Sequence, residues 1–235
     1  MRATGLRLCA LIPARGGSKG LVRKNLRAFR GTPLVAHAVE TARHVSGLDR
    51  IVVSTDDHEI AEVARRAGAE VPFLRPPELA TDETPTLPVV QHAVRWLESH
   101  GVRVDAVVLL QATSPLRTAP HVEAAITKFL ETGADSVTTV CAVEDNPYWM
   151  QRLEGDRLRP LMAEGQRYAR RQDLPSVYRL TGAVYVTRRD VIMEQGRMLG
   201  DDTRAIVVGR RESIDVDDEL DLRLAELIAA EEVSA

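Results

Sequence analysis

Residues 11–25, LIPARGGSKGLVRKN, carry the side chains best suited to bind an anion. An apolar run, Leu6–Ile12, ends at a glycine-rich loop with four basic side chains, which are Arg15, Lys19, Arg23 and Lys24. Glycine lets main-chain N–H groups approach an oxyanion closely, and the basic side chains supply the opposing charge. The segment therefore predicts a site for a polyphosphate, with a solvated basic loop as the alternative.

The loop departs from two widespread nucleotide-binding motifs. The Walker pattern is absent, because Lys19 is followed by glycine and not by Ser or Thr. The Rossmann pattern is absent as well, since the glycines fall at 16, 17 and 20 and the next helical pattern begins only at Pro33. Any phosphate site here is therefore of a different kind.

Two carboxylates near the end of the chain are the second set of residues that suggest chemistry. Asp215 and Asp217 alternate at the end of a strand-like segment, and alternate side chains of an extended backbone point to the same side. A hard divalent cation bound to a triphosphate uses oxygen ligands of this type. The alternative is that Asp217 or Asp218 caps the final helix, because Asp is a preferred N-cap.

Four segments together resemble one family. They are Leu11–Gly20 with Lys24-Asn25 after it, Leu110–Arg117 (LQATSPLR), Arg171–Pro175 (RQDLP) and Ile214–Asp221 (IDVDDELD). In these motifs, and in their order and spacing, the chain is similar to the acylneuraminate cytidylyltransferases, also called CMP-sialic acid synthetases. The resemblance extends over nearly the whole chain.

The resemblance implies transfer of CMP from CTP to the anomeric hydroxyl of a nine-carbon 2-keto-3-deoxy sugar acid, with release of pyrophosphate and with Mg²⁺ or Mn²⁺ as cofactor. Sialic, legionaminic and pseudaminic acids all remain open as acceptors. The alternatives are the same reaction on the eight-carbon acid KDO, a NAD(P)-dependent oxidoreductase on a Rossmann sheet, and a nucleotide sensor without catalysis.

By the same resemblance, most of the nucleotide site comes from the glycine-rich loop. The residues expected to hold the phosphates and sugar are Arg15, Gly16, Gly17, Ser18, Lys19, Lys24 and Asn25. Arg75 and Thr86 would contact the cytosine base, and Asp215 and Asp217 would bind the metal. The residues expected to act in catalysis are Arg15, Lys24, Asp215 and Asp217. Val22-Arg23 stands where the family often has Pro-Gly, so Arg23 contacts phosphate or faces water.

The resemblance places three residues at the sugar acid: Gln111, Arg171 and Tyr185. Arg171 would reach the acceptor carboxylate from the partner subunit of a homodimer, and a planar guanidinium suits that contact. Thr181-Gly182 stands where Asn-Gly is usual, which leaves the sugar substituents open.

Composition limits the other partners and the compartment. The 235 residues carry a net charge of −3, which gives no electrostatic argument for nucleic-acid or membrane binding. Cys9 and Cys141 lie in apolar runs without metal-ligand spacing, so we expect reduced cysteines in a cytoplasmic protein. No apolar run approaches the length of a transmembrane helix.

Strand-like and helical patterns alternate along the chain. The expected strands are Leu6–Ile12, Arg50–Ser54, Val104–Leu110, Ser136–Val143, Ala183–Thr187 and Ala205–Val208. The expected helices are Pro33–Ser46, Glu59–Ala67, Ala119–Thr132 and about Asp217 to Ala230. Thr32, Thr84 and Thr118 are expected to cap helices, and Gly47, Gly68, Gly101 and Gly133 to end them. Near-continuous apolar strands separated by helices predict an α/β fold with a doubly wound, mostly parallel sheet.

Residues 144–178 interrupt this alternation with prolines and aromatic side chains. A loop this long inside one compact domain usually has a function. The resemblance implies an arm that is exchanged between the subunits of a homodimer. We therefore expect residues 1–235 to form a single domain with 144–178 as a dimerisation and acceptor-site arm.

Overall fold

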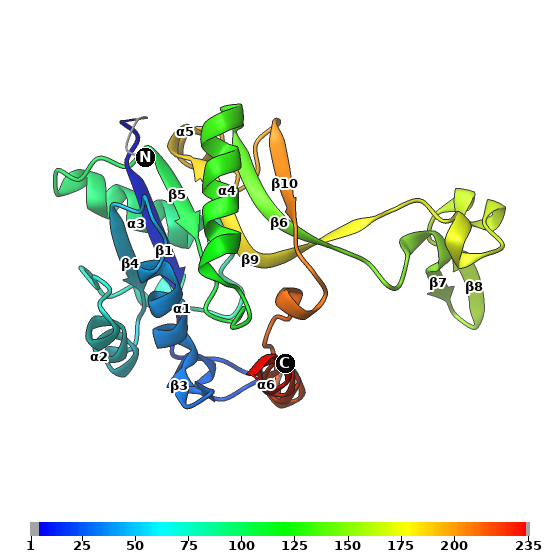
Figure 1. Cartoon of the computed structure of the whole chain (residues 1–235), viewed down its shortest axis with the longest axis horizontal. Coiled ribbons are helices and arrows are strands. Elements are labelled where there is room, and N and C mark those ends of the chain that lie inside the picture. Colours follow the sequence, from blue (N-terminus) through cyan, green and yellow to red (C-terminus); the bar gives the residue numbers. More distant parts are fainter. Residues whose placement is uncertain (1–4, 234–235) are drawn as a thin grey trace.

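The computed structural model describes residues 5–233 and contains a six-stranded sheet between helices (Figure 1). The strand order is β10-β6-β9-β5-β1-β4. The strands are β1 (Leu8–Pro13), β4 (Arg50–Ser54), β5 (Ala106–Leu109), β6 (Ser136–Ala142), β9 (Tyr178–Arg188) and β10 (Thr203–Val207). β1 pairs in parallel with β4 and β5, and β10 with β6, whereas β9 is antiparallel to both of its neighbours. The mostly parallel sheet is confirmed, with one reversed strand.

Helices cover both faces of the sheet. Alternate residues of β1 point to opposite faces, so Ala10 and Ile12 pack on one side and Cys9 and Leu11 on the other. The first side carries α1 (Leu34–Arg43), α2 (His58–Ala67) and α4 (Ala119–Thr132), and the second carries α3 (Thr86–Ser99) and α5 (Arg189–Met193). The doubly wound arrangement is therefore confirmed.

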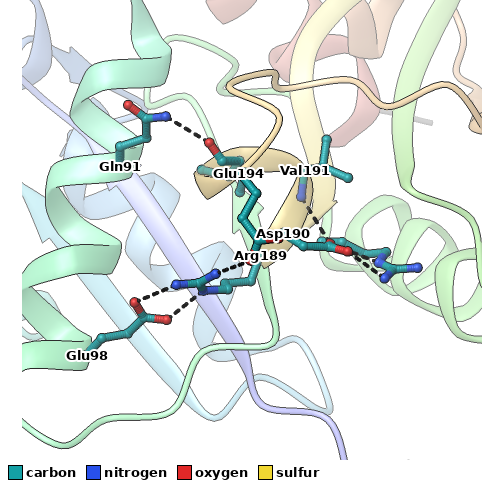
Figure 2. A network of polar contacts seen from close by, with 8 residues as sticks. Gln91, Glu98, Arg189, Asp190, Val191 and Glu194 are labelled. Carbon is teal, nitrogen blue, oxygen red and sulfur yellow. Dashed lines mark hydrogen bonds and ion pairs between the residues drawn. The ribbon is translucent and has the colours of Figure 1, made fainter.

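A polar network fixes the short helix α5 to α3 (Figure 2). The Arg189 guanidinium forms ion pairs with Glu98 of α3 and with Glu194, both at 2.8 Å. The Gln91 amide of α3 donates to the carbonyl of Ile192 at 2.8 Å. Because α5 has only five residues, these contacts hold in place a helix too short to be stable alone.

The helix ends follow the expectations in part. Thr118 forms a capping box with His121 at the start of α4. Thr32 and Thr84 do not cap, because Pro33 and Pro85 are the N-cap residues of α1 and α3. Instead Thr32 lies in a small hairpin of β2 (Ala28–Phe29) and β3 (Thr32–Pro33), so α1 begins at Leu34. The four glycines expected to be left-handed, at 47, 68, 101 and 133, all have positive φ.

Residues 144–177 lie apart from the sheet, between β6 and β9, and the last residue of the expected arm, Tyr178, already belongs to β9 (Figure 1). They form a hairpin of β7 (Gln151–Glu154) and β8 (Arg157–Pro160), and three 3-10 turns, which are η3 (Pro147–Trp149), η4 (Ala163–Arg167) and η5 (Arg171–Asp173). Within this arm the rings of Tyr148 and Tyr168 meet edge to face at 5.3 Å. The arm therefore has packing of its own, separate from the main core.

The last helix, α6 (Glu219–Val233), returns to the N-terminal part of the chain. Leu222 and Ala225 pack with Val216, Leu21 and Phe29 in a separate apolar cluster. Two further 3-10 turns, η1 (Lys24–Leu26) and η6 (Arg211–Ser213), flank this region, and η2 (Pro77–Leu79) precedes α3. Within residues 5–233 no helix is long and apolar enough to cross a membrane.

Candidate active site

A pocket of about 370 Å³ opens where β1 and β5 end. Predicted site residues from distant parts of the chain line it, namely Arg15, Ser18, Lys19, Lys24, Asn25, Arg75, Thr86, Gln111 and Asp217. Ligands of open α/β sheets bind at this edge, outside the carboxyl ends of the strands. The structure therefore brings together most of the residues that the sequence suggested, and their individual roles stay predictions.

Close main-chain contacts hold the glycine-rich loop in this position. The buried Asn25 amide donates to the carbonyl of Arg15 at 2.8 Å. A side chain at Gly20 would collide with the main-chain carbonyl of Asp217, so glycine is required there. The N–H of Gly16 donates to Asp56 at 3.0 Å and is not free for phosphate, while Gly17 is exposed. The loop is therefore held by contacts within it and to Asp56 and Asp217, and its residues Arg15, Ser18, Lys19 and Lys24 line the pocket.

The basic side chains of the loop all have acidic partners. Arg15 and Lys19 pair with the same carboxylate, Asp82, at 2.6 and 2.7 Å. Lys24 pairs with Asp217 at 2.9 Å. Arg23 lies outside the pocket lining and pairs with Asp57 and Glu59, so it neither faces the pocket nor is simply solvated.

Arg75 is buried at the wall of the pocket. Its guanidinium donates to the Ser54 hydroxyl at 3.1 Å and to the carbonyls of Ser54 and Leu79. Burial lowers the pKa of Arg75 to about 10, and this residue stays cationic at neutral pH. Thr86, the first residue of α3, and Thr84 line the same wall. Recognition of the cytosine base by Arg75 and Thr86 stays a prediction.

The two candidate metal ligands are distinct from the helix cap. The Asp218 carboxylate caps α6, because its Oδ1 accepts from the N–H groups of Leu220 and Asp221 at 2.8 and 3.0 Å. The Asp215 carboxylate lies beside Thr113, and its Oδ1 is buried without a hydrogen-bond partner among the described residues. Burial raises the pKa of Asp215, the nearby charge of Asp217 adds to this, and Thr113 and Lys24 oppose it.

These residues fit a divalent cation. An unpartnered buried carboxylate oxygen beside a second carboxylate is the donor set that Mg²⁺ or Mn²⁺ takes when the ligand's phosphates complete its coordination. Residues 5–233 contain no cluster of three or more His, Cys, Asp or Glu side chains able to hold a metal by itself. A cation held by Asp215 and Asp217 would therefore need further ligands from the nucleotide.

The predicted acceptor residues lie in three different places. Gln111 lines the pocket, and its side chain lies against Gly182, where φ is +76° and a Cβ would collide with Gln111 Oε1. Tyr185 lies behind the pocket on β9, where burial and then Asp215 raise the pKa of its hydroxyl. Arg171 is exposed in η5 of the arm and does not line the pocket of its own chain. The Thr181 hydroxyl forms a hydrogen bond with that of Thr139 at 2.7 Å, so it links β9 to β6 within the sheet.

Sequence reasoning missed three residues beside the pocket. Asp82 pairs with two basic side chains of the loop, Thr113 bonds to Asp215, and Arg117 is buried and donates to the carbonyls of Gln111 and Ala183. Thr113 and Arg117 belong to the LQATSPLR segment, so their position after a strand was a usable signal. Nothing in the local pattern around Asp82 distinguishes it from an ordinary loop acid.

The arrangement of these residues is suited to the transfer of a nucleotidyl group. Basic side chains and the Asp217 carboxylate line the pocket, and Asp215 lies near Asp217. The site thus has groups that can balance the charge of a polyphosphate and hold a bridging cation. Such transfers depend on positioning and charge neutralisation more than on a protein nucleophile. The class of protein that this fold and site define is a nucleotidyltransferase.

Comparison with known proteins identifies the family. The chain belongs to the cytidylyltransferase family, whose sequence profile matches residues 9–199, and it is therefore a CTP-dependent enzyme. It is 35% identical to the CMP-N,N'-diacetyllegionaminic acid synthase of Legionella pneumophila, over 94% of this chain and 95% of the relative. It is 33% identical to the pseudaminic acid cytidylyltransferase of Campylobacter jejuni, over 94% of this chain and 95% of the relative.

The fold has a counterpart among solved structures. A CMP-2-keto-3-deoxy-manno-octonic acid synthetase complexed with CTP superposes with a TM-score of 0.72 over 96% of this chain and 99% of that one, at 20% identity. At this identity the likeness concerns the fold alone. Membership of the cytidylyltransferase family gives no support to the alternative function, a nicotinamide-dependent oxidoreductase.

Proposed function

We propose that this cytidylyltransferase transfers CMP from CTP to the anomeric hydroxyl of a nine-carbon 2-keto-3-deoxy sugar acid of the sialic, legionaminic or pseudaminic type. The observation that carries the proposal is a pocket that combines the basic loop residues with Gln111 and Asp217, while the buried Asp215 lies near Asp217. Relatives that match nearly the whole chain are named for legionaminic and pseudaminic acid.

Each wall of the pocket has a separate task in this reaction. Arg15, Lys19 and Lys24 balance the charge of the triphosphate, which has to approach a carboxylate-bearing acceptor. Asp215 and Asp217 would hold Mg²⁺ or Mn²⁺, which supplies further neutralisation of the phosphates when bound. Gln111, fixed against Gly182, orients the acceptor hydroxyl from the opposite side.

The arm supports a homodimeric enzyme. Both strands of the β7–β8 hairpin are exposed, and Leu153 and Leu158 are 67% and 64% exposed. A two-stranded hairpin is marginally stable in water without a surface to pack on. A second copy of the chain provides that surface, and Arg171 then reaches the acceptor site of the neighbour. The reduced cysteines and the expected cytoplasmic location agree with a CTP-consuming reaction.

The test is a comparison of acceptors. Pyrophosphate release from CTP is measured with sialic, legionaminic and pseudaminic acids and with KDO, each with Mg²⁺ present. We expect at least one nine-carbon acid to be used in preference to KDO. Preference for KDO over all three would refute the proposed acceptor class, while the cytidylyltransferase assignment would stand.

A further inference from the structure

One ion-pair cluster beside the pocket has no assigned role. The Asp82 carboxylate accepts from Arg15 through one oxygen and from Lys19 through the other. Arg15 and Asp82 are 28% and 29% exposed, whereas Lys19 is 85% exposed. Solvent screens the exposed pair with Lys19 strongly, whereas the pair with Arg15 is partly sheltered.

The two ends of the Arg15 guanidinium have different environments. Its Nη2 is held by Asp82 at 2.6 Å. Its Nη1 is buried and has no hydrogen-bond partner among the described residues. Because a buried donor without a partner is costly, this nitrogen is the natural donor for an oxygen of the ligand. Nη2 of Arg15 is thus anchored by Asp82, and Nη1 is available to donate to a phosphate.

Asp82 is not part of the pocket lining. The described residues that line the pocket include Arg15, Lys19 and Thr84, but not Asp82. Asp82 therefore does not stand where a phosphate would bind, which argues against a carboxylate that merely substitutes for the ligand.

A closed turn holds Asp82 at this place. Thr84 N–H donates to the carbonyl of Thr81 at 3.3 Å, and the hydroxyls of the same two residues meet at 2.7 Å. The turn follows Leu79, whose carbonyl accepts from Arg75. One segment, residues 75–86, thus supplies the wall expected to contact the base and also the anchor of the phosphate-binding arginine.

We propose that Asp82 is a positioning residue for CTP, which anchors Arg15 through Nη2 so that Nη1 meets the phosphates. The proposal rests on the proposed use of CTP. Loss of the anchor is expected to weaken CTP binding by about 10-fold, which corresponds to about 1.4 kcal/mol. Cytidine has no phosphate, and its binding is expected to be unchanged.

The experiment is a double-mutant cycle read from CTP binding by calorimetry in the presence of Mg²⁺, without an acceptor. Asp82→Asn is expected to weaken binding in the wild-type background and to have no further effect on Arg15→Ala, because Asp82 acts through Arg15. Asp82→Glu keeps the charge and is expected to keep most of the affinity, which provides a second variant if Asp82→Asn folds poorly. Asp201→Asn, which removes an exposed pair with Arg197 at the other end of the sheet, is the matched control.

Each contrary result has a separate meaning. Tighter CTP binding by Asp82→Asn would show that the carboxylate competes with phosphate, and equal weakening of cytidine would show a purely structural role. Additive losses in the cycle would show that Asp82 does not act through Arg15. All three overturn the role of Asp82 and leave the proposed function intact, whereas a wild-type chain that binds no CTP refutes the proposed function.

Discussion

Replacing Asp217 by Asn separates metal binding from helix capping, because Asp218 is the residue that caps α6. Asn keeps the size of the side chain and one acceptor oxygen, and it removes the charge that attracts a hard cation. We therefore expect Asp217→Asn to lower turnover at limiting Mg²⁺ and to leave the melting temperature unchanged.

The size of the effect follows from the exposure of the carboxylate. The Asp217 side chain is 77% exposed, so a dielectric constant near that of water is the appropriate one. Coulomb's law then gives about 2 kcal/mol for a divalent cation about 4 Å from a unit charge, which corresponds to a loss of about 30-fold. Because the remaining ligands still bind the cation, high Mg²⁺ should restore part of the activity.

The assay is kcat/KM as a function of Mg²⁺ concentration, with a melting curve for each variant. Asp218→Asn is the matched control, since Asn caps a helix as well as Asp does, and it should behave as wild type. Asp218→Ala should keep its turnover and lose about 1 kcal/mol of stability, or about 2–4 °C in Tm. An unshifted Mg²⁺ dependence in Asp217→Asn would refute the assignment of this carboxylate to the metal.

Three further predictions concern other parts of the site. Burial raises the pKa of Asp215, so the stabilising contribution of this carboxyl is present below the ordinary Asp pKa and is lost as pH rises through the raised pKa. We therefore expect Asp215→Asn to raise the Tm of the metal-free chain at neutral pH but not in acid. A gain in Tm that does not vary with pH would contradict this expectation. Gly182→Ala should lower stability by about 1 kcal/mol and raise KM for the acceptor but not for CTP, because the new Cβ displaces Gln111; equal changes in both KM values would count against it. Mixed inactive Lys24→Ala and Arg171→Ala chains should regain part of the activity in one shared site, and verified subunit exchange without activity would exclude that site.

The sequence predicted most of the framework because hydrophobic periodicity is a local signal. β4 and α4 have the expected bounds, Arg50–Ser54 and Ala119–Thr132. The reversed direction of β9 was not predicted, because an apolar run is the same for a parallel and an antiparallel partner. Thr32 was wrong as a cap, because proline at position 33 is compatible with a strand end as well as with a helix start.

The location of the site could be predicted from the ends of the strands, but the hydrogen-bond and ion-pair partners of its residues could not. The glycine-rich loop and Gln111 both follow strands, and the rule that ligands bind at the carboxyl ends of strands accounts for their shared pocket. It did not indicate that Asp56 accepts from Gly16 or that Asp82 joins Arg15 and Lys19, since such contacts depend on how distant loops pack. The choice between Asp217 and Asp218 as the cap also depended on side-chain rotamers.

The pair between Lys24 and Asp217 joins positions 193 residues apart, and a second pair at 2.7 Å joins Arg27 to Glu219. During synthesis the glycine-rich loop leaves the ribosome early, and the last strand of the sheet ends at Val207. The wall that carries Asp215 and Asp217 is added only afterwards. A chain that stops before residue 214 thus contains every strand of the sheet but lacks Asp215 and Asp217, so the proposed metal-binding wall is the last part of the centre to be synthesised.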